Sequence, residues 1–417
     1  MKFYFDTNMA KIDVPEENMV VFYSSYLHNL LKVNTIAAAM FDYIICKGVG
    51  QEISCEEMAG IIPELEPGDV QEIFDELSIS GLFFTSLGEY HSNCFKNIFQ
   101  STLKSDIKEI YFHLTYRCNL ACEYCYNKNK LNSTAELKLE QWKQIVDDLK
   151  KRSHPRIYFT GGEPTLYKDF TAVVDYVYEA GLQMELLTNG TMLHQISDKT
   201  LKKLSSITVS LDNIGDDKTY RKNSEKYNVI DNILMVHSKG VKINVRSVVS
   251  NDTIEETNEV KKYFSRYDIN YISSIYIPNA PDEICKVPLQ IAPESVDEYY
   301  SMQDVGRCGA CFQVLAIDPS GNIYPCQSLM KNEFILGNVE DRNWLDIVKK
   351  HNLTNYFLYR TVEQIDICRD CKVRTICGGG CPAISYHVYN SLEHRLDYFC
   401  DFLKRDSEYC IMNTECN

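Results

Sequence analysis

The chain has 417 residues, 45% of them hydrophobic and 24% charged, which makes it too long for one ordinary hydrophobic core and indicates a soluble protein of two or three domains. Its formal net charge of −15 opposes binding to nucleic acid or to an anionic membrane. The start of the chain lacks the pattern of a secretory signal, and no apolar run approaches the roughly 20 residues of a membrane span. We therefore expect a cytoplasmic protein with no nucleic-acid or membrane partner.

Residues 1–100 predict a separate α+β domain in which strands come before helices. Capping residues mark the helices: Asn34 precedes the first, Gly48 ends it, and Ser54 with Glu57 forms a capping box before the second. The expected strands cover residues 19–23 and 30–33, and the first and third helices cover residues 36–45 and 69–80.

Residues 105–285 predict an α/β domain, because strand and helix patterns alternate along them. The strand patterns cover residues 107–114, 157–160, 184–187, 207–211, 241–249 and 271–277. Helical patterns lie between them, for example at residues 139–151 and 169–180. Six such repeats predict a parallel sheet with right-handed crossovers, in the form of a partial (β/α)6 TIM barrel. Functional residues are then expected at the carboxyl ends of the strands.

Residues 300–417 lose this alternation and are rich in cysteine. A helix is expected over residues 343–350, but most of the segment is predicted to be loop. A region with so little regular structure needs another source of stability, and bound metal would supply it. The chain has 17 cysteines and no export signal, which favours metal or cluster binding over structural disulfides.

The first cysteine motif directly follows the first barrel strand. Cys118, Cys122 and Cys125 have C-x3-C-x2-C spacing, and three thiolates can hold a cubic iron–sulfur cluster while one of its irons stays open. A structural zinc site is the alternative, but it wants four protein ligands. A three-cysteine ferredoxin fragment is a second alternative.

This motif resembles that of the radical SAM superfamily, in which the open iron binds the methionine part of S-adenosyl-L-methionine. Gly161-Gly162-Glu163-Pro164 follows the second strand and looks like the family's GGEP turn, which engages the cofactor's amino group. By the same resemblance, Tyr124 lies against adenine and Arg221 binds the carboxylate. Further residues expected to line the carboxylate and ribose side are Thr188, Asn189, Ser210 and Asp212.

Each of these short motifs is an ordinary turn when it stands alone. Their order after successive strands carries the resemblance. The chemistry that it implies is electron transfer from the reduced cluster to the cofactor, which yields a 5'-deoxyadenosyl radical that abstracts hydrogen. The sequence singles out no further catalytic residue.

Eight more cysteines lie downstream and make two sets of four. Their spacing resembles the SPASM extension of radical SAM enzymes, although zinc ribbons are the simpler alternative. The resemblance implies that the sets interleave and that the chain holds three [4Fe-4S] clusters. Auxiliary cluster I would use Cys308, Cys311, Cys326 and Cys381, and auxiliary cluster II would use Cys368, Cys371, Cys377 and Cys400.

Two alternatives stay open within this assignment. If Cys308 is not a ligand, auxiliary cluster I has an open iron that could hold a substrate thiolate. Cys410 and Cys416 are rivals of Cys400.

The N-terminal domain resembles the PqqD-like, winged-helix-like element that recognises the leader of a ribosomally made precursor peptide. The implied binding mode is strand addition at the sheet edge, with apolar anchors beside the third helix. DNA binding is the structural alternative. It is disfavoured because residues 1–100 contain 5 lysines, no arginine and 15 carboxylates, which makes a basic leader more plausible.

Together these features predict a peptide maturase of the sactisynthase or ranthipeptide-maturase type, which forms an intramolecular thioether, carbon–carbon or ether cross-link. A flavodoxin- or ferredoxin-type reductant would supply electrons. The alternative enzyme is an anaerobic sulfatase maturase, but that family has an aspartate where this chain has Gln327. The alternative outside enzymes is a multi-cluster electron carrier.

Overall fold

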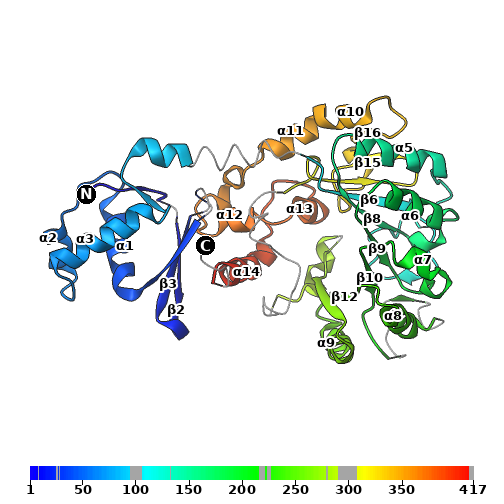
Figure 1. Ribbon diagram of the computed structural model, residues 1–417, viewed down its shortest axis with the longest axis horizontal. Coiled ribbons are helices and arrows are strands. Elements are labelled where there is room, and N and C mark those ends of the chain that lie inside the picture. Colours follow the sequence, from blue (N-terminus) through cyan, green and yellow to red (C-terminus); the bar gives the residue numbers. More distant parts are fainter. Residues whose placement is uncertain are drawn as a thin grey trace.

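A computed structural model describes residues 1–7, 9–24, 27, 29–93, 106–131, 133–215, 221–222, 227–278, 280–289 and 308–412 (Figure 1). The expected domain boundaries near residue 100 and near residue 300 therefore lie outside the described residues. In the described part of the chain, no helix is both long and apolar enough to cross a membrane.

The N-terminal region is an α+β unit with its own hydrophobic core, as expected. Its antiparallel sheet has the order β2-β3-β4. The strands are β1 (Tyr4–Phe5), β2 (Ala10–Val14), β3 (Met19–Ser24), β4 (Asn29–Asn34) and β5 (Phe83–Phe84), and the helices are α1 (Thr35–Lys47), α2 (Cys55–Ile61) and α3 (Pro67–Ile79). Strand β2, a short strand that precedes the turn at Pro15, was not predicted from the sequence.

The helix caps explain where these helices begin. The Asn34 side chain accepts a hydrogen bond from the Ala37 amide at 2.8 Å, and Ser54 accepts one from Glu57 at 3.1 Å, as expected. The Glu57 carboxylate, however, forms an ion pair with Lys47. Helix α3 begins two residues earlier than expected because Glu66 caps it in a reciprocal box.

The expected barrel strands are all present and parallel. They follow one another in the sheet in chain order, as neighbouring βα units should. The strands are β6 (Glu109–Thr115), β8 (Arg156–Gly161), β9 (Met184–Thr188), β10 (Ser206–Ser210), β12 (Ile243–Val249) and β13 (Asn270–Ile275), and the helices between them are α5 (Leu139–Lys150), α6 (Phe170–Glu179), α7 (Asp198–Leu201), α8 (Val229–Ser238) and α9 (Ile254–Phe264). Helices α5 to α8 lie on the outer side of the sheet (Figure 1). The partial (β/α)6 barrel is confirmed.

The C-terminal region is rich in loops, as expected, but it also contains strands and helices that the sequence did not predict. Strand β14 (Val314–Ile317) pairs parallel with β6, and β15 (Asn322–Tyr324) and β16 (Gly337–Asn338) extend the sheet further, to nine strands among the described residues. The helices are α10 (Trp344–Lys350), α11 (Asn352–Tyr359), α12 (Arg374–Cys377), α13 (Pro382–Tyr389) and α14 (Cys400–Met412). This region also shares one hydrophobic core with the barrel, so packing as well as bound metal can stabilise it.

The N-terminal sheet packs against the cysteine-rich region. Ala10, Val21 and Tyr23 form a buried cluster with Val373 and Ile376, which lie between Cys371 and Cys377. Helix α14 lies beside β2 and β3 (Figure 1). The first and last parts of the chain are therefore neighbours in space.

Candidate cofactor and cluster site

Cys118, Cys122 and Cys125 follow the carboxyl end of β6. Cys122 lies in β7 (Ala121–Cys122), which pairs with β11 (Arg221–Lys222) so that Cys122 stands opposite Arg221. Burial raises the pKa of Cys118 to about 11. A hydrogen bond from the Leu120 amide opposes this rise, and the charges of Cys122 and Cys125 add to it. These thiols are free and close enough to influence one another, which fits a site for a positively charged iron–sulfur core.

The Gly161-Gly162 turn holds the strand end that carries Cys118. The Gly162 amide donates to the Thr115 carbonyl at 2.8 Å, and the Glu163 amide donates to the Arg117 carbonyl at 2.8 Å. A Cβ atom at Gly162 would lie 2.4 Å from the Arg117 carbonyl oxygen. Glycine is therefore required here because two backbone segments touch, one of them leading directly into the cysteine loop.

The Glu163 carboxylate joins the ends of β8 and β9. It is fully buried and accepts hydrogen bonds from the Thr165 amide at 3.2 Å and hydroxyl at 2.6 Å, from the Thr188 hydroxyl at 2.8 Å and from the Asn189 amide at 2.8 Å. Burial raises the pKa of Glu163, and these hydrogen bonds oppose the rise. Pro164 begins the short 3-10 helix that presents the Thr165 donors. The carboxylate thus has a structural role beside the cofactor contact that the resemblance implies.

A chain of amides links the end of β9 to the cysteine loop. The side-chain amide of Asn189 donates to Asn119 at 2.9 Å and lies 3.9 Å from the Cys118 sulfur. Asn119 in turn donates to the Thr191 hydroxyl at 2.8 Å. Asn119 and Thr191 were not predicted from the sequence as site residues, although each directly adjoins an expected motif.

Asp212 follows β10 and connects the carboxyl end of this strand to the cysteine loop. The Tyr124 hydroxyl donates to one carboxylate oxygen, and the Val248 amide donates to the other at 2.9 Å. Burial alone would lower the pKa of Arg221, but the charges of Tyr124, Cys122 and Asp212 raise it, so this buried guanidinium stays charged. Ser210, the last residue of β10, is half-buried beside this group. The structure therefore brings the expected pocket residues together at one edge of the sheet.

The auxiliary cysteines divide into two groups. Burial and the charges of Cys308 and Cys381 raise the pKa of Cys326, and Cys308 also acts on Cys311. Burial raises the pKa of Cys377 to about 12, with contributions from Cys368 and Cys400. Cys371 acts on Cys368. These pairwise influences fall within the sets that the sequence predicts, and the interleaved ligand assignment stays a prediction.

The side chain of Cys410 and the whole of Cys416 lie outside the described residues. Within the part of the chain that the structure describes, no three His, Cys, Asp or Glu side chains are grouped tightly enough to hold one metal ion.

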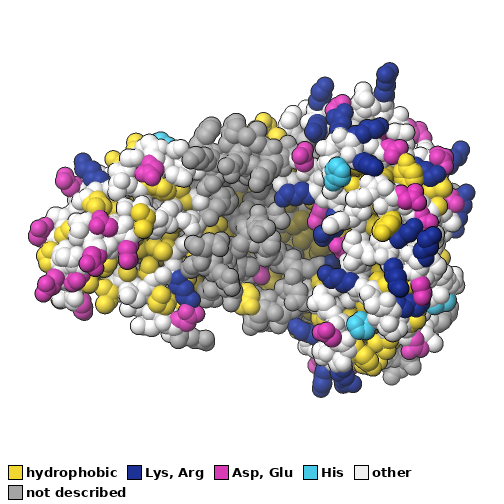
Figure 2. All heavy atoms as spheres, viewed as in Figure 1, with side chains coloured by type: hydrophobic (Ala, Val, Ile, Leu, Met, Phe, Trp, Pro, Cys, Tyr) yellow, Lys and Arg dark blue, Asp and Glu magenta, His cyan; other side chains and the backbone are white. Residues whose placement is uncertain are grey.

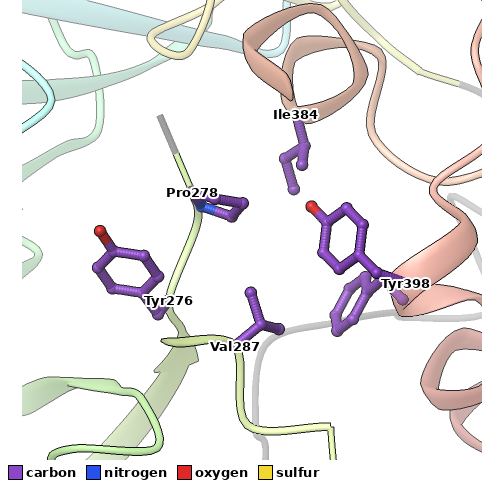
Figure 3. Close-up of a pocket in the computed structure, with 6 residues that line it drawn as sticks. Tyr276, Pro278, Val287, Ile384 and Tyr398 are labelled. Atoms are coloured by element: carbon purple, nitrogen blue, oxygen red, sulfur yellow. The ribbon is translucent and has the colours of Figure 1, made fainter. Parts of the chain in front are cut away.

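Apolar residues pack between the end of the barrel and the auxiliary cysteines. One buried cluster contains Tyr276 and Val287 from the end of the barrel, and Tyr124, Cys377 and Cys381 pack against it. A shallow hollow opens in this seam, and its lining residues are Tyr276, Pro278, Val287, Ile384, Tyr398 and Phe399 (Figure 3). The Tyr398 hydroxyl points into the space between Pro278 and Ile384 (Figure 3).

Comparison with protein families gives two matches. The radical SAM superfamily matches residues 112–264, and SPASM, an iron–sulfur cluster-binding domain, matches residues 308–372. The mycofactocin maturase MftC of Mycolicibacterium smegmatis is 25% identical over 311 residues, 66% of this chain and 78% of that protein. AlbA of Bacillus subtilis, an antilisterial bacteriocin subtilosin biosynthesis protein, is 24% identical over 310 residues, 67% of this chain and 69% of that protein.

Two solved structures share the fold. anSMEcpe with bound AdoMet has a TM-score of 0.56 at 20% identity and covers 74% of this chain and 98% of that chain. SuiB of Streptococcus suis bound to S-adenosylmethionine has a TM-score of 0.53 at 16% identity and covers 95% of this chain and 99% of that chain. A match to 95% of 417 residues leaves out about 21, so it includes most of the N-terminal α+β unit.

An α/β barrel with a three-cysteine loop at the end of its first strand defines the class: the chain is a radical SAM enzyme. More particularly, it carries a SPASM domain after the barrel, and it binds S-adenosyl-L-methionine and iron–sulfur clusters.

Proposed function

We propose that the chain is a peptide maturase that binds a ribosomally made precursor peptide by its leader and forms an intramolecular cross-link in it, either a thioether or a carbon–carbon or ether bond. The observation that carries this proposal is the joining of a three-thiol barrel site, two further thiol sets and a separate N-terminal domain in one chain. Two relatives support it, because MftC is named a mycofactocin maturase and AlbA a subtilosin biosynthesis protein. A structure of SuiB, solved with the precursor peptide SuiA bound, also supports it and matches this chain with a TM-score of 0.52.

At the barrel site, Cys118, Cys122 and Cys125 would hold a [4Fe-4S] cluster with one open iron. S-adenosyl-L-methionine, when bound there, supplies the radical chemistry that removes a hydrogen atom from the peptide. Arg221 stays charged and buried, which suits it to a carboxylate. Asp212 can accept from hydroxyls beside the Tyr124 ring.

The residues of the two auxiliary sets would hold two more [4Fe-4S] clusters, which gives three per chain. A peptide that has lost a hydrogen atom must lose one more electron to close a bond, and the auxiliary clusters offer that electron a route. A flavodoxin- or ferredoxin-type protein would reduce the barrel cluster. Arg360 and the Gly378-Gly379-Gly380 segment lie between these sets.

The leader would bind at β4, an edge strand of the N-terminal sheet. The side chain of Asn29, its first residue, donates to the Ser80 carbonyl at 2.9 Å, which ties β4 to the end of α3. Ile79, in the last turn of α3, is 84% exposed and can accept an apolar anchor of the leader. Acidic side chains gather on this domain in Figure 2, which supports a basic leader.

The test uses the full chain, purified and reconstituted without oxygen, with short peptides encoded next to its gene. Under dithionite we expect deoxyadenosine and a peptide lighter by two hydrogens. The same core peptide without its leader is the control and should react far more slowly. Failure to cleave the cofactor would favour an electron carrier, and loss of sulfur from a cysteine would favour formylglycine formation.

A further inference from the structure

Arg360 is a buried cation that forms no ion pair with an acid among the residues that the structure describes. It follows α11 and is 9% exposed. Its Nη1 atom contacts the Gly378 carbonyl at 3.5 Å, the outer limit of a hydrogen bond, and its Nε atom is buried without a hydrogen-bond partner. Among the described residues, no ion pair joins Arg360 to a carboxylate. Arg360 and Glu393 both act on the neighbouring Tyr356, with opposite effects on its pKa.

The surroundings of Arg360 belong to both auxiliary sets. The guanidinium lies on the Gly378-Gly379-Gly380 segment, which connects Cys377 of set II to Cys381 of set I. These glycines have φ values of 61°, 78° and 80°, and a Cβ atom at Gly379 would lie 3.9 Å from Nη2 of Arg360. Glycine therefore lets the segment turn tightly beside the cation.

The charge of Arg360 acts on thiols of both auxiliary sets. Burial raises the pKa of Cys308, Cys381 and Cys368, and the charge of Arg360 opposes the rise at all three. Cys308 and Cys381 belong to set I, and Cys368 belongs to set II. Arg395 also acts on Cys368, but Arg395 forms an ion pair with Asp397 at 3.0 Å.

A buried guanidinium cannot shed its proton, and a buried charge is costly unless it is paired. The compensating charge should therefore be negative and lie where the two thiol sets meet. A [4Fe-4S] core bound by four thiolates carries net negative charge, and nearby charge is one of the factors that set its reduction potential.

We propose that Arg360 is the shared counter-ion of the two auxiliary clusters and raises the reduction potential of both. This inference rests on the proposed function, because it requires clusters in the auxiliary sets. Arg360 then makes each cluster a better acceptor for the electron that the peptide loses. It is a positioning residue that acts through the clusters and touches no substrate.

The test compares Arg360→Met, which removes the charge and keeps most of the bulk, with Arg360→Lys, which keeps the charge. Both are made in the reconstituted holoenzyme, and Arg342→Met, at an exposed arginine of the same domain, is the matched control. Midpoint potentials come from anaerobic redox titration followed by electron paramagnetic resonance. We expect Arg360→Met to favour oxidation of both auxiliary clusters at least tenfold, a shift of about 59 mV for one electron.

The barrel cluster should keep its potential in every variant, and Arg360→Lys should stay close to the unmodified enzyme. Unchanged auxiliary potentials in Arg360→Met with full iron content would overturn the inference. So would equal loss of auxiliary iron in Arg360→Met and Arg360→Lys, because shape and not charge would then matter. If the unmodified enzyme itself lacks auxiliary signals, the proposed function fails at that point, before any variant is compared.

Discussion

The barrel cysteines and the auxiliary cysteines lie in different surroundings. Polar groups adjoin the barrel set, among them Asn119, Asn189 and Arg221. Apolar packing surrounds the auxiliary sets, with Arg360 as a buried cation between them. The proposed barrel set has three thiols, and each proposed auxiliary set has four. In the proposed function, the barrel site holds a polar cofactor at an open iron and therefore needs polar groups beside it, whereas the auxiliary sites only pass electrons and need neither.

The strongest way to break this comparison is Cys118→Ala. With two thiolates left, the barrel cluster should be lost, so we expect no measurable deoxyadenosine. Iron should fall from about 12 to about 8 per chain, by the four irons of each cubic cluster. Cys285→Ala, at an exposed cysteine outside the three sets, should keep full activity and iron. Cofactor cleavage by the Cys118 variant would refute the assignment of the open iron.

The interleaving of the auxiliary sets can be tested with two cysteines that are four positions apart. Cys377→Ala and Cys381→Ala should each remove about four irons, because the residues belong to different clusters. Cross-link formation should fall by at least about a hundredfold in either variant, while cofactor cleavage stays within about tenfold, since the barrel site is untouched. Deoxyadenosine and product are measured in the same reaction.

Double variants make this test sharper. Cys381→Ala with Cys326→Ala affects one set and should lose no more iron than Cys381→Ala alone. Cys381→Ala with Cys377→Ala affects both sets and should lose about eight irons. The reverse order of iron loss would show that the sets do not interleave.

Two buried carboxyls allow a second comparison of the two regions: Glu163 at the polar barrel site and Asp406 in the apolar region. In Glu163→Gln, one oxygen becomes an NH2 group. Because the Thr165 and Asn189 amides bond different oxygens, that group must face a backbone N–H in either orientation. We expect about 2–4 kcal/mol less stability and roughly tenfold weaker cofactor binding, measured by thermal unfolding and by titration with S-adenosyl-L-methionine. Glu140→Gln, at a carboxylate whose side chain is 79% exposed, should change neither.

Local patterns in the sequence predicted much of this architecture. Hydrophobic alternation located the barrel strands, and capping residues such as Asn34 located helix ends, because both signals lie within a few neighbouring positions. The pairing of β14 with β6 could not be predicted in this way, since it joins Val314 to Glu109 across about 200 residues. The buried position of Arg360 could not be predicted either, because segments that are separate in the sequence surround it. The cysteine sets could be predicted only because their spacing resembles a known family.

We expect the smallest effect on activity from a substitution at Asp406 on α14. Asp406 is a buried carboxyl like Glu163, but it lies in the apolar region. Asp406 is 3% exposed and its Oδ2 atom has no hydrogen-bond partner, and burial raises its pKa from 3.8 to about 6. Because the folded state holds this proton more tightly than the unfolded state, its contribution to stability is complete below pH 3.8 and is lost as the pH rises through about 6.

Asp406→Asn removes this dependence, because the amide does not ionise. Relative to the variant, the unmodified enzyme should therefore lose stability between about pH 4 and pH 7, by roughly 3 kcal/mol for a shift of about two pKa units. The measurement is the unfolding temperature of both proteins across this range. Asp401→Asn on the same helix, where the side chain is 97% exposed, should follow the unmodified enzyme. Parallel pH profiles for Asp406→Asn and the unmodified enzyme would mean that the carboxyl finds a partner in solution, and the contrast with Glu163 would then fail.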